Sequence, residues 1–462
     1  MSDCDLLIVG AGPAGMTAAI TARHHGLDVL VVDDQPAPGG QIWRSVEMAR
    51  ARDEILGPSY SEGRAVAEVF RTCGARYEPG AKLWQVEPGY RAFYSLGETP
   101  RVVEAGSIIL ATGAQERPVP FPGWTLPGVL TVGAAQILLK NAGQIPANPV
   151  WIAGSGPLPL LYAIQLLRAG GQIAGYLDTT PSGRWRSAIR HLPGAIPAFG
   201  EILKGLDWIK ALRRSGTRYV KDVAEIEAVG EERIETLHYR TADGHSFSAP
   251  ANVLLVHEGV VPHIHAPMSL GCTMEWTGAQ DCLAPTVDEW GETSLNGVFV
   301  AGDGAGIGGA KAATLRGKLA ALRVAERSGR IGARDAVSAA RSVRRALARE
   351  LAVRPFLDAL FRPRPQVFAP PDETIVCRCE EVTAGDVRKM AMVGRPGPNQ
   401  MKAATRAGMG PCQGRQCGYT IARLIAATQD RSPADVGFFN VRPPLKPITV
   451  GELAALDGIA AR

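Results

Sequence analysis

The sequence predicts an α/β fold in which one nucleotide-binding type of unit is inserted in another and a small helical unit follows. Three observations support this prediction. An apolar run leads into closely spaced glycines at residues 5–15, a similar pattern restarts at 151–159, and four cysteines gather between 377 and 417. A buried strand that ends in a glycine-rich turn and continues as a helix is typical of a Rossmann-like domain. We therefore expect two Rossmann-like domains and a cysteine domain.

The totals limit what the chain can be. Its 462 residues allow two or three domains, and 46% hydrophobic with 21% charged residues describe an ordinary globular protein. The net charge of +5 gives no sign of nucleic-acid binding, and no apolar run is long enough to span a membrane. The chain begins directly with a strand, so we expect no signal peptide and a cytoplasmic protein, with peripheral contact to the inner face of the membrane as an option. Eight cysteines without an export signal argue against a disulfide framework.

The first candidate site is the opening turn. Residues 6–9 predict a strand and 13–25 a helix, with glycines at 10, 12 and 15 between and within them. Gly10 permits the tight turn, Gly12 lets the backbone approach a pyrophosphate, and Gly15 lets helix and strand pack closely. Pro13 and Ala14 fall in the first helical turn, where free N–H groups favour an anion. We predict a dinucleotide site here.

Later loops add candidates to the same site. The strand expected at 27–32 ends at Asp33 and Asp34, the spacing at which a carboxylate meets an adenosine ribose. The turn-rich loop 35–42 carries Gly40 and Gln41, which either wrap the cofactor or form an ordinary loop. The strand expected at 81–86 contributes Leu83.

Two further strand tips complete the predicted site. Residues 107–113 form a strand that ends at Thr112 and Gly113, and 298–303 form one that ends at Gly302 and Asp303. Small residues at a strand tip allow close backbone contact with a cofactor. Asp303 precedes a helix expected at 310–325, so it binds a ribityl hydroxyl, caps that helix, or does both.

The second unit repeats the opening pattern with one departure. Gly154 and Gly156 keep their places, but Pro159 stands at the third glycine position. The next strand, 172–177, ends at Asp178. A helix near 201–214 and strands near 219–240 continue the unit. A bound NAD(P), another nucleotide such as ATP, and a structural relic all remain open for this site.

The resulting division of the chain is as follows. A discontinuous dinucleotide-binding domain covers 1–145 and 250–330, with the strand 253–256 as its point of return, and the insert covers 146–249. Residues 331–371 are expected to form a helical, proline-rich linker whose arginines face solvent, and 372–462 form the cysteine domain.

The cysteine pattern indicates an iron–sulfur cluster. Cys377-x-Cys379 and Cys412-x4-Cys417 lack the CxxC knuckles of zinc sites but suit a sulfide-bridged 2Fe-2S cluster held by thiolates. Zinc and purely structural cysteines are the alternatives. Residues 383–386 predict a capping box, and a helix is expected directly after Cys417. The chain has no CxxC, which argues against dithiol chemistry, and no nucleophile–base pair suggests a catalytic residue.

Taken together, these motifs resemble a known family. The glycines of the first turn, Gly40-Gln41, Thr112-Gly113 and Gly302-Asp303 occur in the order found in glutathione and thioredoxin reductases. Residues 34–42 and 112–124 and the cysteine tail narrow the resemblance to the alpha subunits of bacterial multi-subunit amino-acid and opine dehydrogenases. That group includes opine oxidase, hydroxyproline and proline dehydrogenases, and hydrogen cyanide synthase. The tail resembles bacterioferritin-associated ferredoxin.

The resemblance implies FAD at the first site, a 2Fe-2S cluster, and FMN at a subunit interface in related enzymes. It also implies a beta subunit, similar to D-amino-acid oxidases, that oxidises the C–N bond of an opine such as octopine or nopaline, or of proline or D-hydroxyproline. A quinone or other carrier as electron acceptor, together with a small ferredoxin-like gamma subunit, follows from the same likeness. The alternatives are a self-sufficient NAD(P)H-dependent ferredoxin-type reductase, one component of a hydrogen cyanide synthase, and a scaffold with a vestigial nucleotide.

Overall fold

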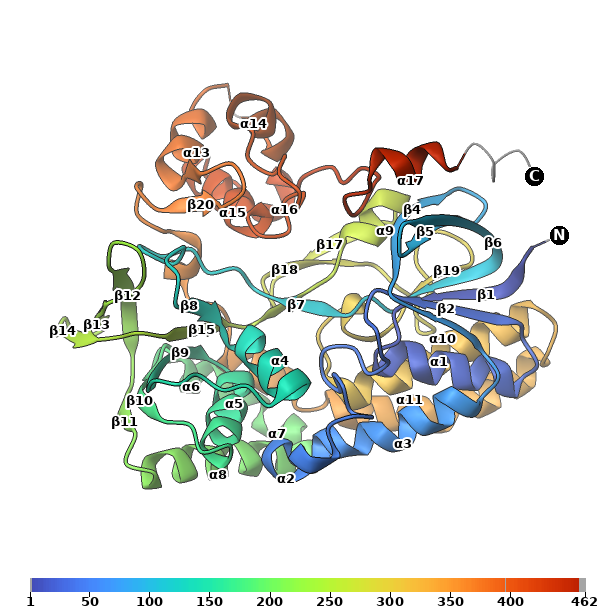
Figure 1. Cartoon of the computed structure of the whole chain (residues 1–462), viewed down its shortest axis with the longest axis horizontal. Helices are drawn as coiled ribbons and strands as arrows, with labels where there is room; N and C mark the ends of the chain where they lie inside the picture. Colours follow the sequence, from blue (N-terminus) through green and yellow to red (C-terminus); the bar gives the residue numbers. More distant parts are fainter. Residues whose placement is uncertain (1, 395, 457–462) are drawn as a thin grey trace.

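The first sheet carries the opening turn at its edge (Figure 1). The computed structural model describes residues 2–394 and 396–456, so 1, 395 and 457–462 of the predicted domains lie outside the described residues. The strand order is β3-β2-β1-β6-β5-β4, and β19 pairs with β6. The strands are β1 (Cys4–Val9), β2 (Val29–Asp33), β3 (Arg76–Pro79), β4 (Ala81–Glu87), β5 (Arg91–Leu96), β6 (Thr99–Leu110) and β19 (Val298–Val300).

Strand β6 joins two kinds of pairing. Its first half runs antiparallel to β5, and its second half runs parallel to β1 and β19. Val9 and Val300 both pair with Leu110, so the three strands end at one edge. The turns that follow these strands are therefore neighbours, as the predicted site requires.

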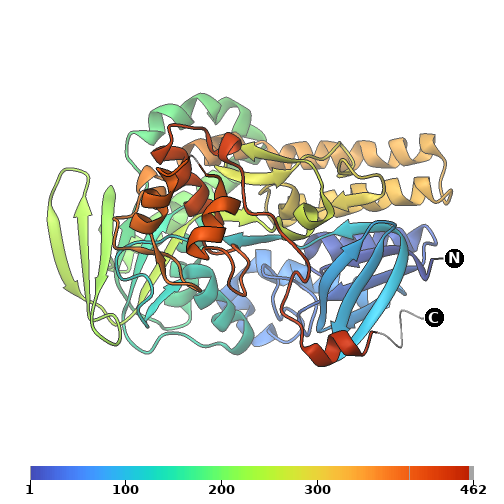
Figure 2. The ribbon, with the colours of Figure 1, turned by 90° about the horizontal axis from the view of Figure 1, so that it is seen from above.

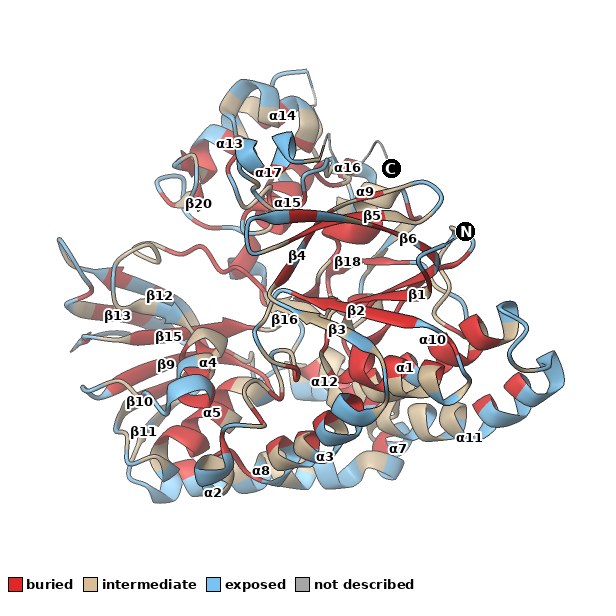
Figure 3. Ribbon diagram, turned by 45° about the vertical axis from the view of Figure 1, so that its right-hand side comes forward, coloured by how far each residue is buried: buried red, intermediate tan, exposed pale blue. Residues whose placement is uncertain are grey.

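Helices cover one face of this sheet. Helix α1 (Pro13–His24), α3 (Pro58–Thr72) and α10 (Ala310–Arg327) bury small and apolar residues against the same core as Leu6 and Ile8, and short α2 (Asp53–Leu56) precedes α3. A Cβ on Gly317 of α10 would lie 2.1 Å from the Ala14 carbonyl oxygen, so this glycine lets α10 pack directly on α1. Figure 3 shows the buried strands between exposed helix surfaces.

The second sheet is entirely parallel, in the order β11-β10-β9-β15-β8. Its strands are β8 (Val129–Thr131), β9 (Val150–Ser155), β10 (Ile173–Asp178), β11 (Arg218–Val220) and β15 (Leu254–Glu258). Helices α4 (Val132–Ala142), α5 (Pro157–Arg168) and α8 (Phe199–Arg214) accompany it, after the short α6 (Arg184–Ala188) and α7 (Leu192–Ala195). A three-stranded antiparallel sheet of β12 (Val223–Val229), β13 (Thr236–Thr241) and β14 (Ser246–Pro250) shares a core with the other face.

One prediction about this sheet was wrong. We expected 253–256 to return to the first sheet, but β15 pairs with β9 and β8 in the second. A short apolar run shows that a strand is buried but does not show which sheet takes it. Since β8 and α4 also precede residue 146, this pairing would move both ends of the insert outward. The domain boundaries themselves stay a prediction.

Two antiparallel strands cross between the sheets. Strand β7 (Ala114–Glu116) leaves the first sheet and pairs with β16 (Val260–Pro262), which returns to it. Helix α9 (His265–Leu270) and the hairpin of β17 (Met274–Thr277) and β18 (Cys282–Pro285) follow.

The expected linker is largely folded. Helix α11 (Ala333–Leu351) packs on α10 through Ala336 and Ala340, and α12 (Arg354–Leu360) follows it. Most of α11 is solvent-facing, as predicted, but the Arg344 guanidinium lies 4.3 Å from the centre of the Trp290 ring.

The cysteine domain sits above the junction of the two sheets (Figures 1 and 2). It comprises β20 (Ile375–Cys377), β21 (Val382–Thr383), α13 (Ala384–Ala391), α14 (Pro398–Thr405), α15 (Gly418–Thr428), α16 (Pro433–Val436) and α17 (Val450–Ala454). The predicted capping box is confirmed, because Thr383 and Asp386 exchange the expected bonds. Over the described residues, no helix is both long and apolar enough to cross a bilayer.

Candidate cofactor site and cysteine cluster

The turn between β1 and α1 requires glycine at two positions. Gly10 has a φ of +105°, and a Cβ there would lie 2.5 Å from the Ala111 carbonyl oxygen. A Cβ on Gly15 would lie 1.8 Å from the Gly10 carbonyl oxygen. Gly12 differs: its φ is −74°, and its added Cβ would meet nothing closer than the Gly40 Cα at 3.7 Å. No side chain caps α1, which begins at Pro13, so its first-turn N–H groups are available to an anion.

The two acids after β2 are both occupied. The Asp33 carboxylate accepts the backbone N–H of Ala11 and, at 2.6 Å, that of Gln35. Burial raises the pKa of Asp33 to about 6. Asp34 forms an ion pair with Lys446, whose charge, against the effect of burial, lowers the pKa of Asp34. Asp33 thus braces the glycine turn, while contact of either acid with a ribose stays a prediction.

The loop after these acids lies on the glycine turn. A Cβ on Gly40 would lie 2.9 Å from the Gly12 Cα, so loop and turn touch. The buried Lys140 of α4 fastens the loop, because its Nζ donates to the Gln41 carbonyl oxygen at 3.0 Å and to Gln136 Oε1 at 2.9 Å. A cavity of about 260 Å³ opens beside it, lined by Gln35, Pro36, Ala37, Gly40, Arg44, Ser45 and Asn141.

Lys140 gives a pH-dependent prediction. Burial lowers its pKa to about 7, whereas an unfolded lysine stays protonated up to about 10. The unfolded state therefore binds more protons between these pH values, and Lys140 makes stability rise with pH across that window. Lys140→Met should flatten this rise, measured as urea midpoints at pH 7, 8 and 9, whereas Lys311→Met at an exposed position should not. An unchanged slope in Lys140→Met would contradict the assignment.

The other strand tips converge on the same turn. Gly302 has a φ of +79°, and its added Cβ would lie 3.0 Å from the Ala14 Cβ. Asp303 Oδ1 accepts the N–H groups of Gly308 and Gly309, at 2.8 and 2.9 Å, directly before α10. Asp303 therefore has the capping role, and its cofactor role stays a prediction.

Thr112, Gly113 and Leu83 lie at the same edge but differ in exposure. Thr112 and Gly113 directly follow β6 and are partly exposed. Leu83 is 7% exposed and packs in a core cluster with Val9 and Leu110. Its side chain lies in the core beside these strand ends.

The four predicted cysteine ligands form two pairs. Cys377 is hydrogen-bonded to Cys417, and Cys379 to Cys412. The Cys417 thiol and the backbone N–H groups of Gly408, Glu380 and Cys379 lower the pKa of Cys377 to about 6, against the effect of burial. Cys377 and Cys417 are buried, whereas Cys379 is exposed.

This arrangement fits two irons better than one ion. No group of three or more His, Cys, Asp or Glu side chains within 2–394 and 396–456 is close enough to hold a single metal ion. Zinc would draw all its sulfur ligands to about 2.3 Å. Two thiolate pairs match a cluster in which each iron takes two sulfurs. The N–H donors to Cys377, and the start of α15 directly after Cys417, favour an anionic centre.

Hydrogen bonds connect the cysteine loop to the first site. Gln115 of β7, which follows Thr112 and Gly113, donates from Nε2 to the Arg415 carbonyl oxygen at 2.9 Å. His265 Nε2 lies 3.0 Å from the Gln413 carbonyl oxygen, and the His263 N–H donates to the Gly113 carbonyl oxygen at 3.0 Å. The loop that carries Cys412 and Cys417 therefore lies against the strands that leave and re-enter the first domain.

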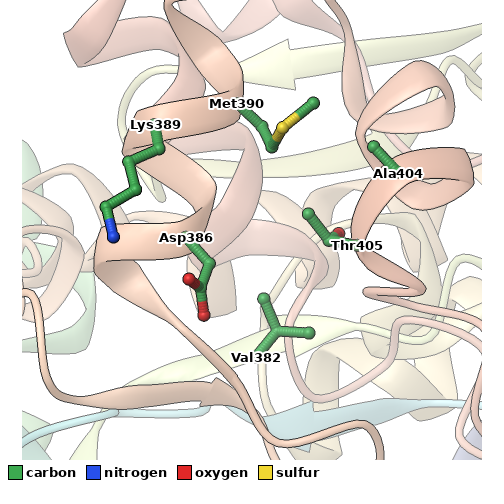
Figure 4. Close-up of a pocket in the computed structure, with 6 residues that line it drawn as sticks. All are labelled: Val382, Asp386, Lys389, Met390, Ala404 and Thr405. Atoms are coloured by element: carbon green, nitrogen blue, oxygen red, sulfur yellow. The ribbon is translucent and has the colours of Figure 1, made fainter.

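A second cavity lies elsewhere. It measures about 290 Å³, between α13 and α14 (Figure 4), and is lined by Val382, Asp386, Lys389, Met390, Ala404 and Thr405. None of these is a predicted site residue, and we place no function there.

Comparison with known proteins decides the family. Residues 4–329 match the family described as "Pyridine nucleotide-disulphide oxidoreductase", and residues 372–457 match the sarcosine oxidase A3 domain. The chain is 42% identical to the opine oxidase protein of the "A" type from Rhizobium meliloti (strain 1021), over 99% of both chains. The chain belongs to the pyridine nucleotide-disulphide oxidoreductases, in the family of the opine oxidase A subunits. It is thus an oxidoreductase subunit, and the predicted resemblance is confirmed.

Other relatives agree with this assignment. The chain is 32% identical to hydrogen cyanide synthase subunit HcnB of Pseudomonas aeruginosa, over 96% of each chain. The crystal structure of L-proline dehydrogenase from P. horikoshii superposes with a TM-score of 0.70 at 19% identity, covering 97% of this chain and 79% of that one. The latter likeness shows the fold alone.

Sequence reasoning missed the partners of several site residues. Lys140, Lys446 and Gln115 stand 99, 412 and 300 positions from the groups they bind. His257, which we considered as a flavin-side residue or a plain turn, places Nδ1 2.7 Å from Glu116 Oε1 instead. No local pattern marks such pairs, because each side chain alone resembles an ordinary surface or turn residue.

Proposed function

We propose that the chain is the FAD- and 2Fe-2S-binding electron-transfer subunit of a multi-subunit dehydrogenase. The observation that carries this is the bond from Gln115 to the Arg415 carbonyl oxygen, which joins the strand leaving the predicted flavin site to the loop with Cys412 and Cys417. When bound, the flavin would accept electrons and the cluster would pass them on singly. The chain's own residues bind, orient and shield these groups.

Each predicted cofactor has a support in the residues present. The uncapped start of α1 and the Gly12–Gly40 contact suit the pyrophosphate of FAD. The two cysteine pairs suit a 2Fe-2S cluster. FMN at an interface with another subunit is proposed from the family resemblance.

The proposed substrate and partners follow from the relatives. Since the chain matches an opine oxidase protein along its whole length, we propose that a separate beta subunit oxidises the C–N bond of an opine or of an imino acid such as proline or D-hydroxyproline. A quinone or other carrier, and a small ferredoxin-like gamma subunit, complete the proposal. A hydrogen cyanide synthase role is the second candidate, favoured by the likeness to HcnB.

The experiment is an anaerobic titration of the co-purified complex. Addition of octopine or nopaline should bleach the flavin and then reduce the cluster, followed by absorbance and electron paramagnetic resonance. Glycine, the simplest amino-acid donor, tests the cyanide-synthase role. Rapid bleaching of the isolated chain by NADH, with no response of the complex to any amine donor, would contradict the proposal in favour of a self-sufficient reductase.

We also propose cytoplasmic residence with peripheral contact to the inner face of the membrane. All eight cysteines are free, which suits a reducing compartment. Residues 185–206 expose large apolar side chains among the exposed cations Arg186 and Arg190, a combination that suits an anionic lipid surface. The apolar side chains are Trp185, Ile189, Ile196, Phe199, Leu203 and Leu206.

Substitution in this segment gives a direct prediction. Ile196 is 68% exposed, so Ile196→Glu should weaken co-sedimentation with anionic vesicles severalfold without unfolding the chain. Met392→Glu, at a site 69% exposed in the cysteine domain, should leave sedimentation unchanged. Equal loss in both variants, or no binding by the unmodified complex, would contradict membrane contact.

A further inference from the structure

The second Rossmann-like unit has a crevice where a dinucleotide would be expected. In open parallel sheets, ligands bind beyond the carboxyl ends of the strands, where the strand order reverses. In the order β11-β10-β9-β15-β8 this point lies between β9 and β15. Strands β9, β10 and β15 end there at Ser155, Asp178 and Glu258.

A segment of the chain itself occupies the edge of this crevice. Arg364 Nε lies 2.8 Å from Glu258 Oε1, and the two side chains are 5% and 3% exposed. Arg364 also donates to the Ala224 carbonyl oxygen. Arg184, which follows β10, donates to the carbonyl oxygens of Arg362 and Pro363, the latter at 3.1 Å. The segment 362–364 is therefore held by the loop after β10, by β12 and by the end of β15.

The next residues bury their side chains beside the same sheet. Val367 and Phe368, in a short helical turn at Pro365–Phe368, are 1% and 5% exposed and belong to the core cluster that contains Trp151 and Leu177. The guanidinium of Arg423, on α15 of the cysteine domain, lies 4.5 Å from the Phe368 ring centre. The segment therefore packs on the second unit on one side and on the cysteine domain on the other.

The groups that would hold a dinucleotide are otherwise engaged. The Asp178 carboxylate, at the ribose position, accepts the Tyr219 hydroxyl at 2.6 Å and the Thr180 N–H at 3.0 Å. Pro159 is buried at the third glycine position. The residues present therefore do not fit a nicotinamide dinucleotide.

We propose that residues 362–368 replace the nucleotide of the second unit, which serves as the anchor of the cysteine domain and does not bind NAD(P). The buried Arg364–Glu258 pair fixes the segment, and Phe368 continues the contact to α15. The neighbouring cluster loop is thereby held against β7. This inference does not depend on which cofactor fills the first site.

Hydrogen–deuterium exchange of the holoprotein tests both halves. With millimolar NADH or NADPH, exchange at residues 153–160 and 178–184 should not change; slowing there would overturn the proposal. In Arg364→Ala, exchange at residues 366–369 should rise at least tenfold. Arg362→Ala is the matched control, because Arg362 is partly exposed and only its carbonyl oxygen accepts the bond from Arg184.

Unchanged exchange at 366–369 in a folded Arg364→Ala variant would overturn the anchoring role. If that variant does not fold, the nucleotide measurement on the unmodified protein still decides whether the second unit binds NAD(P). Failure of this proposal would appear as protection in the second unit, whereas failure of the electron-transfer function would appear as an unreactive flavin in the complex. The two outcomes are therefore distinguishable.

Discussion

Gly12→Ala should yield a folded protein that has lost its flavin. The backbone at Gly12 has a φ of −74°, which alanine adopts easily, and the added methyl would meet nothing closer than 3.7 Å. The methyl would, however, project where the backbone must approach a pyrophosphate. We expect FAD binding to weaken at least about tenfold, about 1.4 kcal/mol. The measurement is the ratio of flavin absorbance to protein after purification, with a titration of added FAD.

Two comparisons make this prediction specific. Gly15→Ala should fail to fold, because its Cβ would lie 1.8 Å from the Gly10 carbonyl oxygen. Gly183→Ala adds a methyl at a position with a φ of −62° and open surroundings, and it should change neither folding nor flavin content. Full flavin occupancy in Gly12→Ala would show that the cofactor does not sit on this turn.

The parts of the site that sequence could predict are those encoded locally. Gly10, Gly12 and Gly15 stand next to the strand and helix whose geometry they permit, and the Thr383–Asp386 capping box joins residues three positions apart. The cysteine ligands could be proposed because their spacing alone limits the metal chemistry. In each case the physical constraint acts within a few residues.

The remaining parts depend on which distant segments meet. The ion pair of Asp34 with Lys446, and that of Glu258 with Arg364, join residues 412 and 106 positions apart. The same limit explains β15, whose apolar run fits either sheet until its neighbours are known. The proline-rich stretch at 362–371 looked like a boundary because proline count indicates stiffness, whereas its burial depends on Val367 and Phe368 finding a core.

Cys377→Ser should remove the iron and acid-labile sulfide while the flavin stays. Cys377 is 1% exposed, lies beside Cys417, and receives three backbone N–H groups, so it is the best prepared thiolate of the set. A serine oxygen is a poorer ligand for this iron chemistry than a thiolate. We expect iron content in anaerobically purified protein to fall to near background, with unchanged flavin absorbance. Because metal binding contributes to folding, the cysteine domain should also unfold at a lower denaturant concentration.

Cys73→Ser is the matched control, since Cys73 is a partly buried cysteine on the first domain and should keep full iron content. Substrate should still bleach the flavin of the assembled Cys377→Ser complex, because substrate oxidation is assigned to the beta partner, whereas only the onward path passes through the cysteine domain. Reoxidation by an artificial dye that accepts electrons from flavin should persist, while transfer to the one-electron carrier should stop. Iron retained at the level of the unmodified protein would remove Cys377 from the ligand set and, with it, the proposed route from β7 to the cysteine loop.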